Sequence, residues 1–282
     1  MSQIIFDEQP NLYIEKETCK ILMPDMHYHN TCELYYILEG GREYFIEDKF
    51  FTTHKGDFVY IPAEMLHRTD GQLTTRILTY VGDPFISRYF TKEMCNTLFP
   101  TEPFVFRPEE SKADIFNNMF IELFAELGNS KKNATKKDAV RVAGLLFKIM
   151  FFATNERNTY VEQPFPDKRI SPIVQYINKN FAQIGSIEEI ANRFFLSKYY
   201  LCHMFKASLG VPLITYLHTI RIKAACEMIE SGKYKITEIA TKCGFNTTPY
   251  FCKVFKDEKG ITPSEYRQSL KKDYNIHTEF LQ

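Results

Sequence analysis

The sequence predicts an α+β protein of two domains: an N-terminal antiparallel β-barrel with two following helices, and a C-terminal all-α domain. Three observations support this fold class. Short β-prone runs fill residues 1–107, helical patterns dominate the rest, and one helix-turn-helix pattern occurs twice after residue 185. The chain of 282 residues also has room for two domains of roughly 100–200 residues each.

Charge divides the chain in the same way. Residues 168–282 contain 17 Lys and Arg against 10 Asp and Glu, a net charge of +7, whereas residues 1–167 carry a net charge of −7. The basic half indicates a polyanion as partner, although charge also varies between domains without such a role. The seven cysteines form no Cys-x-x-Cys pair, and neither a signal segment nor a membrane-length apolar run is present. We therefore expect a cytoplasmic protein with reduced thiols and no membrane partner.

The N-terminal domain is expected over residues 1–155. Runs such as "ELYYIL" and "REYFIE" read as strands, and Gly40-Gly41 between them predicts a two-residue hairpin turn. Helices are predicted over 112–127 and 138–155. The second is more apolar than one contact surface requires, so we expect homodimerisation through it, with Leu146 or Met150 in the interface. The proline-containing residues 156–168 are the expected linker to the second domain, 169–272.

The internal repeat is the most informative feature of the C-terminal domain. Its first copy begins at Ser186 and its second at Lys235, and each reads as a short helix, a tight turn and a second helix. Small and apolar residues occupy matching positions in the two copies, Gly210 and Gly260 end the second helices, and a longer helix over 213–230 joins the units. Helical repeats also bind proteins, but tight turns and basic, polar second helices favour DNA.

The repeat resembles the DNA-binding domain of AraC/XylS-type transcription regulators. The likeness covers residues 170–270 and includes "CGFNTTPYFCKVFKDEKGITPSEYR". It implies that the second helix of each unit enters the major groove of double-stranded DNA. His203 stands where the family often has arginine, which leaves the preferred base at that position open. The residues expected to contact DNA are Ser197, Lys198, Tyr199, Cys202, His203 and Lys206 in the first unit, and Thr247, Thr248, Pro249, Tyr250, Lys253 and Lys256 in the second. Among them, Lys206 and Lys256 suit phosphates.

The N-terminal domain resembles a cupin barrel, which many AraC-type regulators carry. "HYHNTCELYYILEG" matches the first cupin motif, and "GDFVYIPAEMLH" resembles the second except that Glu64 replaces a glycine. Strand alternation places odd-numbered residues from 27 to 37 on one face, the barrel interior in such a fold. The expected effector-binding residues are His27, His29, Glu33, Tyr35 and His67.

Three interpretations of that interior remain open. We favour a metal-free effector pocket, with no cofactor. Alternatively, His27, His29, Glu33 and His67 hold a divalent metal such as Zn, Ni, Mn or Fe. In the third interpretation these side chains only satisfy nearby backbone groups.

The predicted function is sequence-specific transcription regulation, as a dimeric activator that responds to a small molecule. The effector is a sugar or another metabolite, and the expected partners are DNA, a second subunit and RNA polymerase. The alternatives are a metal-responsive regulator and, less favoured, a metal-dependent cupin enzyme. We expect no catalytic residues, because a tandem DNA reader gives the barrel a use that needs binding and not turnover.

Overall fold

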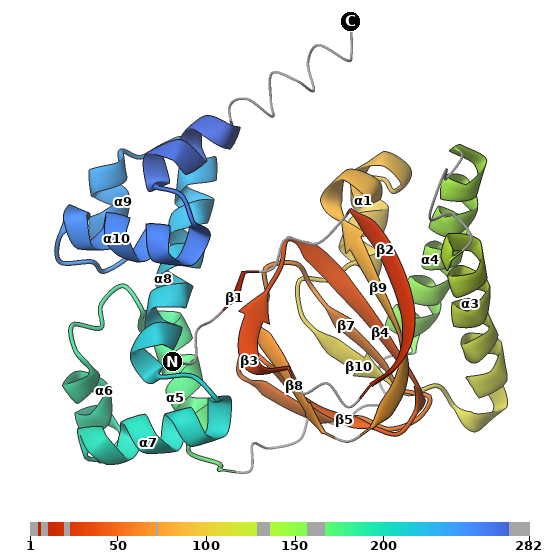
Figure 1. Ribbon diagram of the computed structural model, residues 1–282, viewed down its shortest axis with the longest axis horizontal. Coiled ribbons are helices and arrows are strands. Elements are labelled where there is room, and N and C mark those ends of the chain that lie inside the picture. The colour runs from red at the N-terminus through yellow and green to blue at the C-terminus, as the bar shows by residue number, and fades with distance from the viewer. Residues whose placement is uncertain are drawn as a thin grey trace, which may run out of the picture. The chain divides into compact units, whose positions relative to one another are not determined.

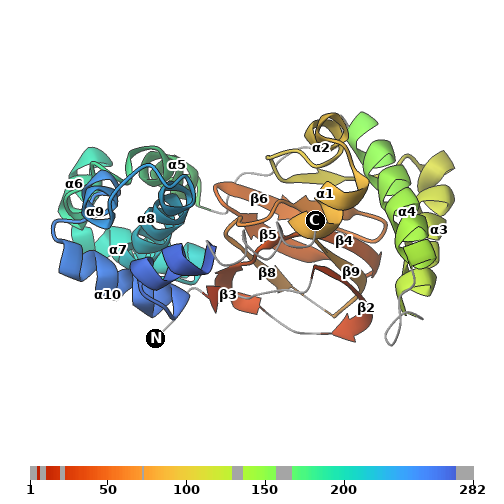
Figure 2. The same cartoon turned by 90° about the horizontal axis from the view of Figure 1, so that it is seen from above.

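The computed structural model describes residues 5–6, 11–19, 23–71, 73–128, 136–156 and 167–270. Its contacts divide the chain into two compact units, one of Asp7–Phe165 and one that joins Met1–Phe6 to Pro166–Gln282. Figures 1 and 2 show strands and helices in the first unit and helices in the second. The predicted α+β fold with a β-rich N-terminal and a helical C-terminal part is confirmed.

Two antiparallel sheets form the first unit. One contains the strand order β3-β8-β5-β6 and the other the order β10-β7-β4-β9-β2. Their bounds are β2 Leu12–Cys19, β3 Met23–Tyr28, β4 Thr31–Glu39, β5 Arg42–Ile46, β6 Lys49–Thr52, β7 Phe58–Ile61, β8 His67–Gly71, β9 Thr74–Gly82 and β10 Phe104–Phe106, while the short β1, Ile5–Phe6, belongs to the other unit.

The predicted hairpin turn at Gly40-Gly41 is wrong. β4 and β5 flank these glycines but pair with strands of different sheets, so the chain turns a corner between sheets there. Both glycines are required by close backbone approach: a Cβ atom would lie 2.5 Å from the Leu73 carbonyl oxygen at Gly40 and 2.3 Å from the Thr53 carbonyl oxygen at Gly41. A glycine pair alone does not distinguish a hairpin from such a corner.

Strand β4 is buried on both faces. Its even-numbered Leu34 and Tyr36 pack in a core shared with helices, whereas its odd-numbered Tyr35 and Ile37 pack in a second core with residues of other strands such as Tyr44. Alternation of side chains along a strand explains this division. The second core lies between the two sheets.

The helices described in the first unit are α1 Asp83–Tyr89, α2 Lys92–Leu98, α3 Glu110–Gly128 and α4 Lys136–Asn155. In Figure 1, α3 and α4 lie side by side along the strands, and both contribute to the core that contains Leu34. Leu146 and Met150 of α4 are fully buried in that core. Their predicted role in a subunit interface is therefore wrong, because the chain's own sheet and α3 already cover them.

The second unit is helical, with α5 Ile170–Asn180, α6 Ile187–Arg193, α7 Lys198–Leu209, α8 Leu213–Glu230, α9 Ile236–Lys242 and α10 Thr248–Lys259, and with residues 263–270 also helical. α6 and α7 form the first helix-turn-helix, α9 and α10 form the second, and α8 joins them. Within the described parts of the chain, no helix is both long and apolar enough to cross a membrane.

Equivalent devices delimit α7 and α10. The hydroxyl of Ser197 accepts a hydrogen bond from the Tyr200 amide, and that of Thr247 accepts one from the Tyr250 amide. Gly210 and Gly260 end the two helices with φ of 77° and 73°, in the left-handed region that favours glycine. Leu201 and Phe205 of α7, like Phe251 and Phe255 of α10, are fully buried and fix the opposite face of each helix outward.

Candidate functional site

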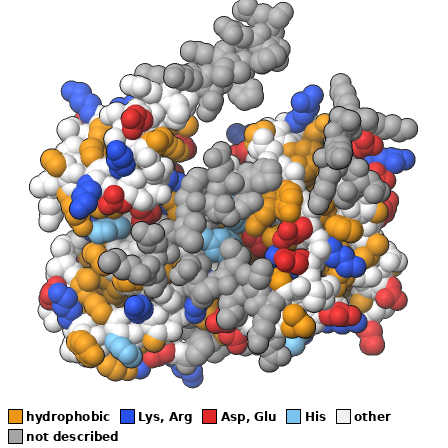
Figure 3. All heavy atoms as spheres, viewed as in Figure 1, with side chains coloured by type: hydrophobic (Ala, Val, Ile, Leu, Met, Phe, Trp, Pro, Cys, Tyr) orange, Lys and Arg blue, Asp and Glu red, His pale blue; other side chains and the backbone are white. Residues whose placement is uncertain are grey.

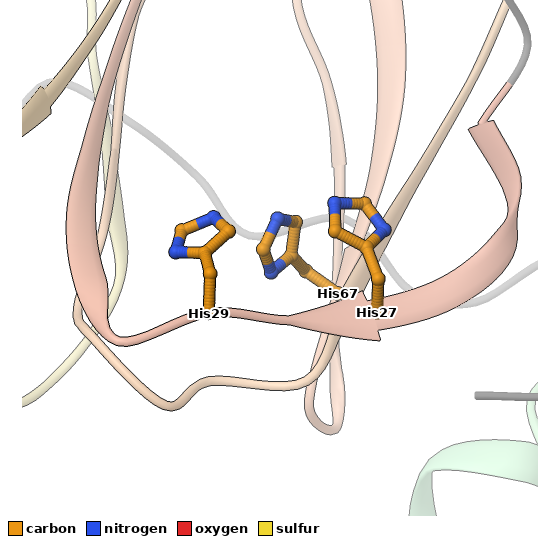
Figure 4. A group of neighbouring side chains, drawn as sticks. All are labelled: His27, His29 and His67. Atoms are coloured by element: carbon orange, nitrogen blue, oxygen red, sulfur yellow. The ribbon is translucent and has the colours of Figure 1, made fainter. Parts of the chain in front are cut away.

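Three histidines come together in the interior of the first unit. His27 lies on β3, His29 directly after it, and His67 on β8, where it pairs in register with His27. Figure 4 shows the three rings projecting to the same side of their strands. All three are buried, and one nitrogen from each lies within 4.8 Å of the others.

Glu33 of β4 reaches two of these histidines. One carboxylate oxygen, Oε2, lies 3.1 Å from His29 Nε2 and 3.4 Å from His67 Nε2. Although burial opposes ionisation, the two imidazoles outweigh it and hold the pKa of Glu33 well below its usual range. The carboxylate is therefore charged at neutral pH.

The remaining nitrogens of His29 and His67 face backbone carbonyls. His29 Nδ1 lies 2.7 Å from the Thr31 carbonyl oxygen, and His67 Nδ1 lies 2.8 Å from that of Met65. A carbonyl can only accept a hydrogen bond, so each Nδ1 carries the proton and donates it. In the neutral tautomer both Nε2 lone pairs then point toward the Glu33 carboxylate. Lone pairs that face a carboxylate repel it, and a cation bound between them would relieve that repulsion.

The cavity beside these groups is small, at about 20 Å³. A cavity of roughly 10–15 Å³ holds one water molecule, whereas sites for drug-sized ligands span about 300–1,000 Å³. In this conformation the space suits an ion or a water molecule and excludes a sugar. Its lining consists of His27, Glu33, Tyr35, Arg42, His67, Thr69, Arg76, Leu78 and Tyr80.

Two arginines of this lining were missed in the sequence analysis. Arg42 donates to Thr69 Oγ1 and to the carbonyl of Cys19, and Arg76 contacts Glu15 and Glu17 and lies 5.1 Å from the Tyr35 ring centroid. Arg76 pairs with Ile37 across β4 and β9, so it shares the interior face. Finding it from sequence would have required the register of the two strands.

The predicted DNA-contacting residues of the first helix-turn-helix lie at the start and along the outer side of α7. Ser197 is its N-cap, and the Lys198 ammonium lies 2.6 Å from the Glu188 carboxylate. Tyr199 is 82% exposed, with its ring roughly parallel to that of His203 at a centroid distance of 6.4 Å. Cys202 is half-buried, and His203 and Lys206 are exposed.

The second helix-turn-helix presents a different set of side chains on α10. Thr247 is the N-cap, Thr248 is half-buried, and Pro249, Lys253 and Lys256 are exposed. The Tyr250 ring contacts those of His218 and Phe245 at centroid distances of 5.7 and 6.2 Å, so part of it packs within its own unit. Figure 3 shows Lys and Arg side chains spread over the visible face of this helical unit.

Comparison with known proteins agrees with this architecture. Residues 22–79 match the family described as Cupin domain and residues 190–269 the family described as Helix-turn-helix domain. The uncharacterised HTH-type transcriptional regulator YdiP of Escherichia coli is 25% identical over 264 residues, 91% of this chain and 86% of that protein. The arabinose operon regulatory protein of E. coli is 25% identical over 80% of this chain and 76% of that protein.

A solved structure of unsaturated fatty acid-bound ToxT from Vibrio cholerae also aligns, at 15% identity, over 93% of this chain and 96% of that chain, with a TM-score of 0.38.

A cupin domain followed by a helix-turn-helix domain defines the class: a transcription regulator that joins a ligand-binding barrel to a DNA-binding module. Both relatives are regulatory proteins, and the match to this chain covers most of the length of each. Within that class, the two domain matches and the similar regulators support an AraC-family regulator with an N-terminal cupin domain.

Proposed function

We propose that this regulator binds a specific operator through α7 and α10 and that a ligand in the barrel interior controls that binding. The observation that carries the proposal is the repeated unit: each reading helix has a hydroxyl N-cap, a glycine C-cap, a buried face of two large apolar residues and a polar outer face. Two such helices in one domain are expected to enter successive major grooves on one face of the DNA. The regulator acts in the cytoplasm, as an activator that contacts RNA polymerase, and as a homodimer.

Two lysines of α10 test the DNA assignment. Lys253 lies in the middle of the outer face and Lys256 nearer the C-terminal end, and both are exposed. Lys253→Ala should cost about 1–3 kcal/mol on the selected site and relax base preference, because a base-edge contact is lost. Lys256→Ala should weaken all sequences alike and reduce the salt slope by about one unit, because a phosphate contact is lost. Fluorescence anisotropy with specific and scrambled DNA at several salt concentrations measures both effects. An unchanged specificity ratio in Lys253→Ala would contradict the groove assignment.

A metal-responsive regulator is the second candidate, and the histidine geometry favours it. His29 and His67 each donate Nδ1–H to a backbone carbonyl, which is how metal-binding histidines are commonly oriented. Their Nε2 atoms, with Glu33 and a nitrogen of His27, form a donor set that fits a divalent transition metal. A bound cation would neutralise the buried carboxylate and fill a cavity of about 20 Å³. The expectation of a sugar effector requires a wider conformation of the barrel.

Glu33→Gln separates the two candidates. The substitution keeps the side-chain shape and removes the charge, so stoichiometric metal should be lost if Glu33 is a ligand. Metal content and calorimetry on full-length protein purified without a histidine tag provide the measurement, with Glu43→Gln, an exposed site, as the charge control. The variant should retain basal DNA affinity in either case. Absence of bound metal in the unmutated protein after incubation with Zn, Mn, Ni and Fe(II) salts would leave the metal-free effector pocket.

A further inference from the structure

The two reading helices differ in their chemistry. The sequence of α7, Lys198–Leu209, contains no Arg, Asn, Gln, Asp or Glu. In the major groove, guanine is read mainly by Arg or Lys, adenine by Asn or Gln and cytosine by Asp or Glu, whereas the thymine C5-methyl group is read by apolar contact. Except for its lysines and for Ser208 in its last turn, α7 therefore lacks the side chains that form the standard polar base contacts.

Tyr199 provides the largest apolar surface on the outer side of α7. It is 82% exposed and lies one turn before His203, whose ring is inclined by only 23° to its own. The neighbouring Tyr200 is engaged elsewhere, because its hydroxyl accepts a hydrogen bond of 2.8 Å from Arg169 and the guanidinium lies 5.2 Å from its ring centroid. The Lys198 ammonium likewise contacts Glu188.

The second helix-turn-helix serves as an internal comparison. With Leu201 aligned to Phe251, Tyr199 corresponds to Pro249 and His203 to Lys253. The second helix-turn-helix thus has a lysine ammonium, which can donate to guanine, where the first has the His203 imidazole beside the Tyr199 ring. Equivalent N-caps, glycine C-caps and buried residues position the two helices in the same way.

We propose that the first helix-turn-helix contacts thymine methyl groups through Tyr199, with His203 positioning the Tyr199 ring. The DNA half-site that α7 contacts then contains thymine. This inference rests on the proposed function, since it requires α7 to enter the major groove. A tyrosine ring covers a methyl group without a directional partner, and burying one methyl group contributes roughly 0.8 kcal/mol, which corresponds to about a fourfold change in affinity.

The test begins with selection of binding sites from a random DNA library by the full-length protein. Each thymine of the selected site is then replaced singly by deoxyuridine, which removes only the methyl group. We expect one or two positions at which the replacement weakens binding about three- to fivefold. Tyr199→Ala should bind thymine DNA that much more weakly and lose its sensitivity to deoxyuridine at the same positions, whereas Tyr199→Phe should keep that sensitivity.

Lys253→Ala is the matched control, because it alters the other reading helix and should leave the deoxyuridine response of the first half-site unchanged. Because the Tyr199 side chain is exposed, Tyr199→Ala should remain folded, and circular dichroism checks this. Equal deoxyuridine sensitivity in the unmutated and Tyr199→Ala proteins, or insensitivity of every selected thymine, would overturn the inference alone. A selection that enriches no sequence would instead reject the proposed function, and this inference with it.

Discussion

At the scale of single residues, the turn of the first helix-turn-helix contains an unusual choice. Phe195 has φ of 55° and its side chain is 96% exposed. The corresponding residue of the second helix-turn-helix is Gly244, with φ of 79°. In each motif the next residue donates its amide to the carbonyl of the preceding alanine, Ala191 or Ala240. Glycine adopts this left-handed conformation without the steric cost of a Cβ atom, whereas a bulky residue there is strained.

Phe195→Gly should therefore stabilise the helical unit. Relief of the left-handed conformation contributes about 1–2 kcal/mol, and the added freedom of glycine in the unfolded chain offsets about half of it, which leaves roughly 0.5–1 kcal/mol. The reciprocal Gly244→Ala should destabilise by more than this, because its Cβ would lie 2.5 Å from the Ala182 carbonyl oxygen. Thermal unfolding followed at the helical circular dichroism band measures both. A lower midpoint for Phe195→Gly would mean that the phenyl ring makes a stabilising contact in solution.

At the scale of elements, the junction of α8 and α10 holds a half-buried carboxyl group, that of Glu258. Burial raises the pKa of Glu258 to about 7, and Thr219 donates a hydrogen bond of 2.7 Å to its Oε1. Between about pH 4.5 and 7 the folded protein keeps a proton that the unfolded chain has released. The free energy of unfolding therefore falls as the pH rises through that window and stays reduced above it.

Glu258→Gln keeps an acceptor for Thr219 and removes the ionisation. We expect it to raise the free energy of unfolding by roughly 1–3 kcal/mol at pH 8 and to leave stability nearly unchanged at pH 4.5. Denaturation at both pH values provides the measurement, and Glu227→Gln, an exposed position on α8, is the control for a simple change of net charge. Equal effects of the two substitutions at pH 8 would show that Glu258 titrates normally.

Elements were predicted more accurately than their connections. The helix over 213–230 and the caps at Ser197, Gly210 and Gly260 follow from local apolar spacing and end signals, which act within one or two turns of chain. By contrast, α1 and α2 were missed, and the corner at Gly40 was taken for a hairpin, because strand partners depend on contacts far apart in the sequence. The site followed the same rule: the motif gave Glu33 and the histidines, but not Arg76.

At the scale of the whole molecule, the same limit affects the expected dimer. The apolar composition of α4 predicted an interface, yet Leu146, Ile149 and Met150 pack inside the subunit. The side of α4 that remains accessible carries Val140, Gly144, Phe147 and Phe151, spaced by four, three and four residues. Phe147 and Phe151 stack at a centroid distance of 5.6 Å. This spacing is typical of a helix that packs along a partner helix, so a second copy of α4 is the expected partner.

Adjacent residues of α4 allow a matched test of that dimer. Phe151 is 50% exposed, so Phe151→Glu should leave the subunit folded and yield monomers by placing a charge in the interface. Met150 is fully buried, and Met150→Glu should unfold the barrel unit, because it introduces an unpaired charge into the core. Lys148→Glu, at an exposed position of the same helix, controls for the change in charge. Sedimentation at micromolar concentration, combined with circular dichroism, distinguishes folded monomer from unfolded chain. A folded dimer of Phe151→Glu would exclude this face of α4 as the interface and direct the search to another surface of the subunit.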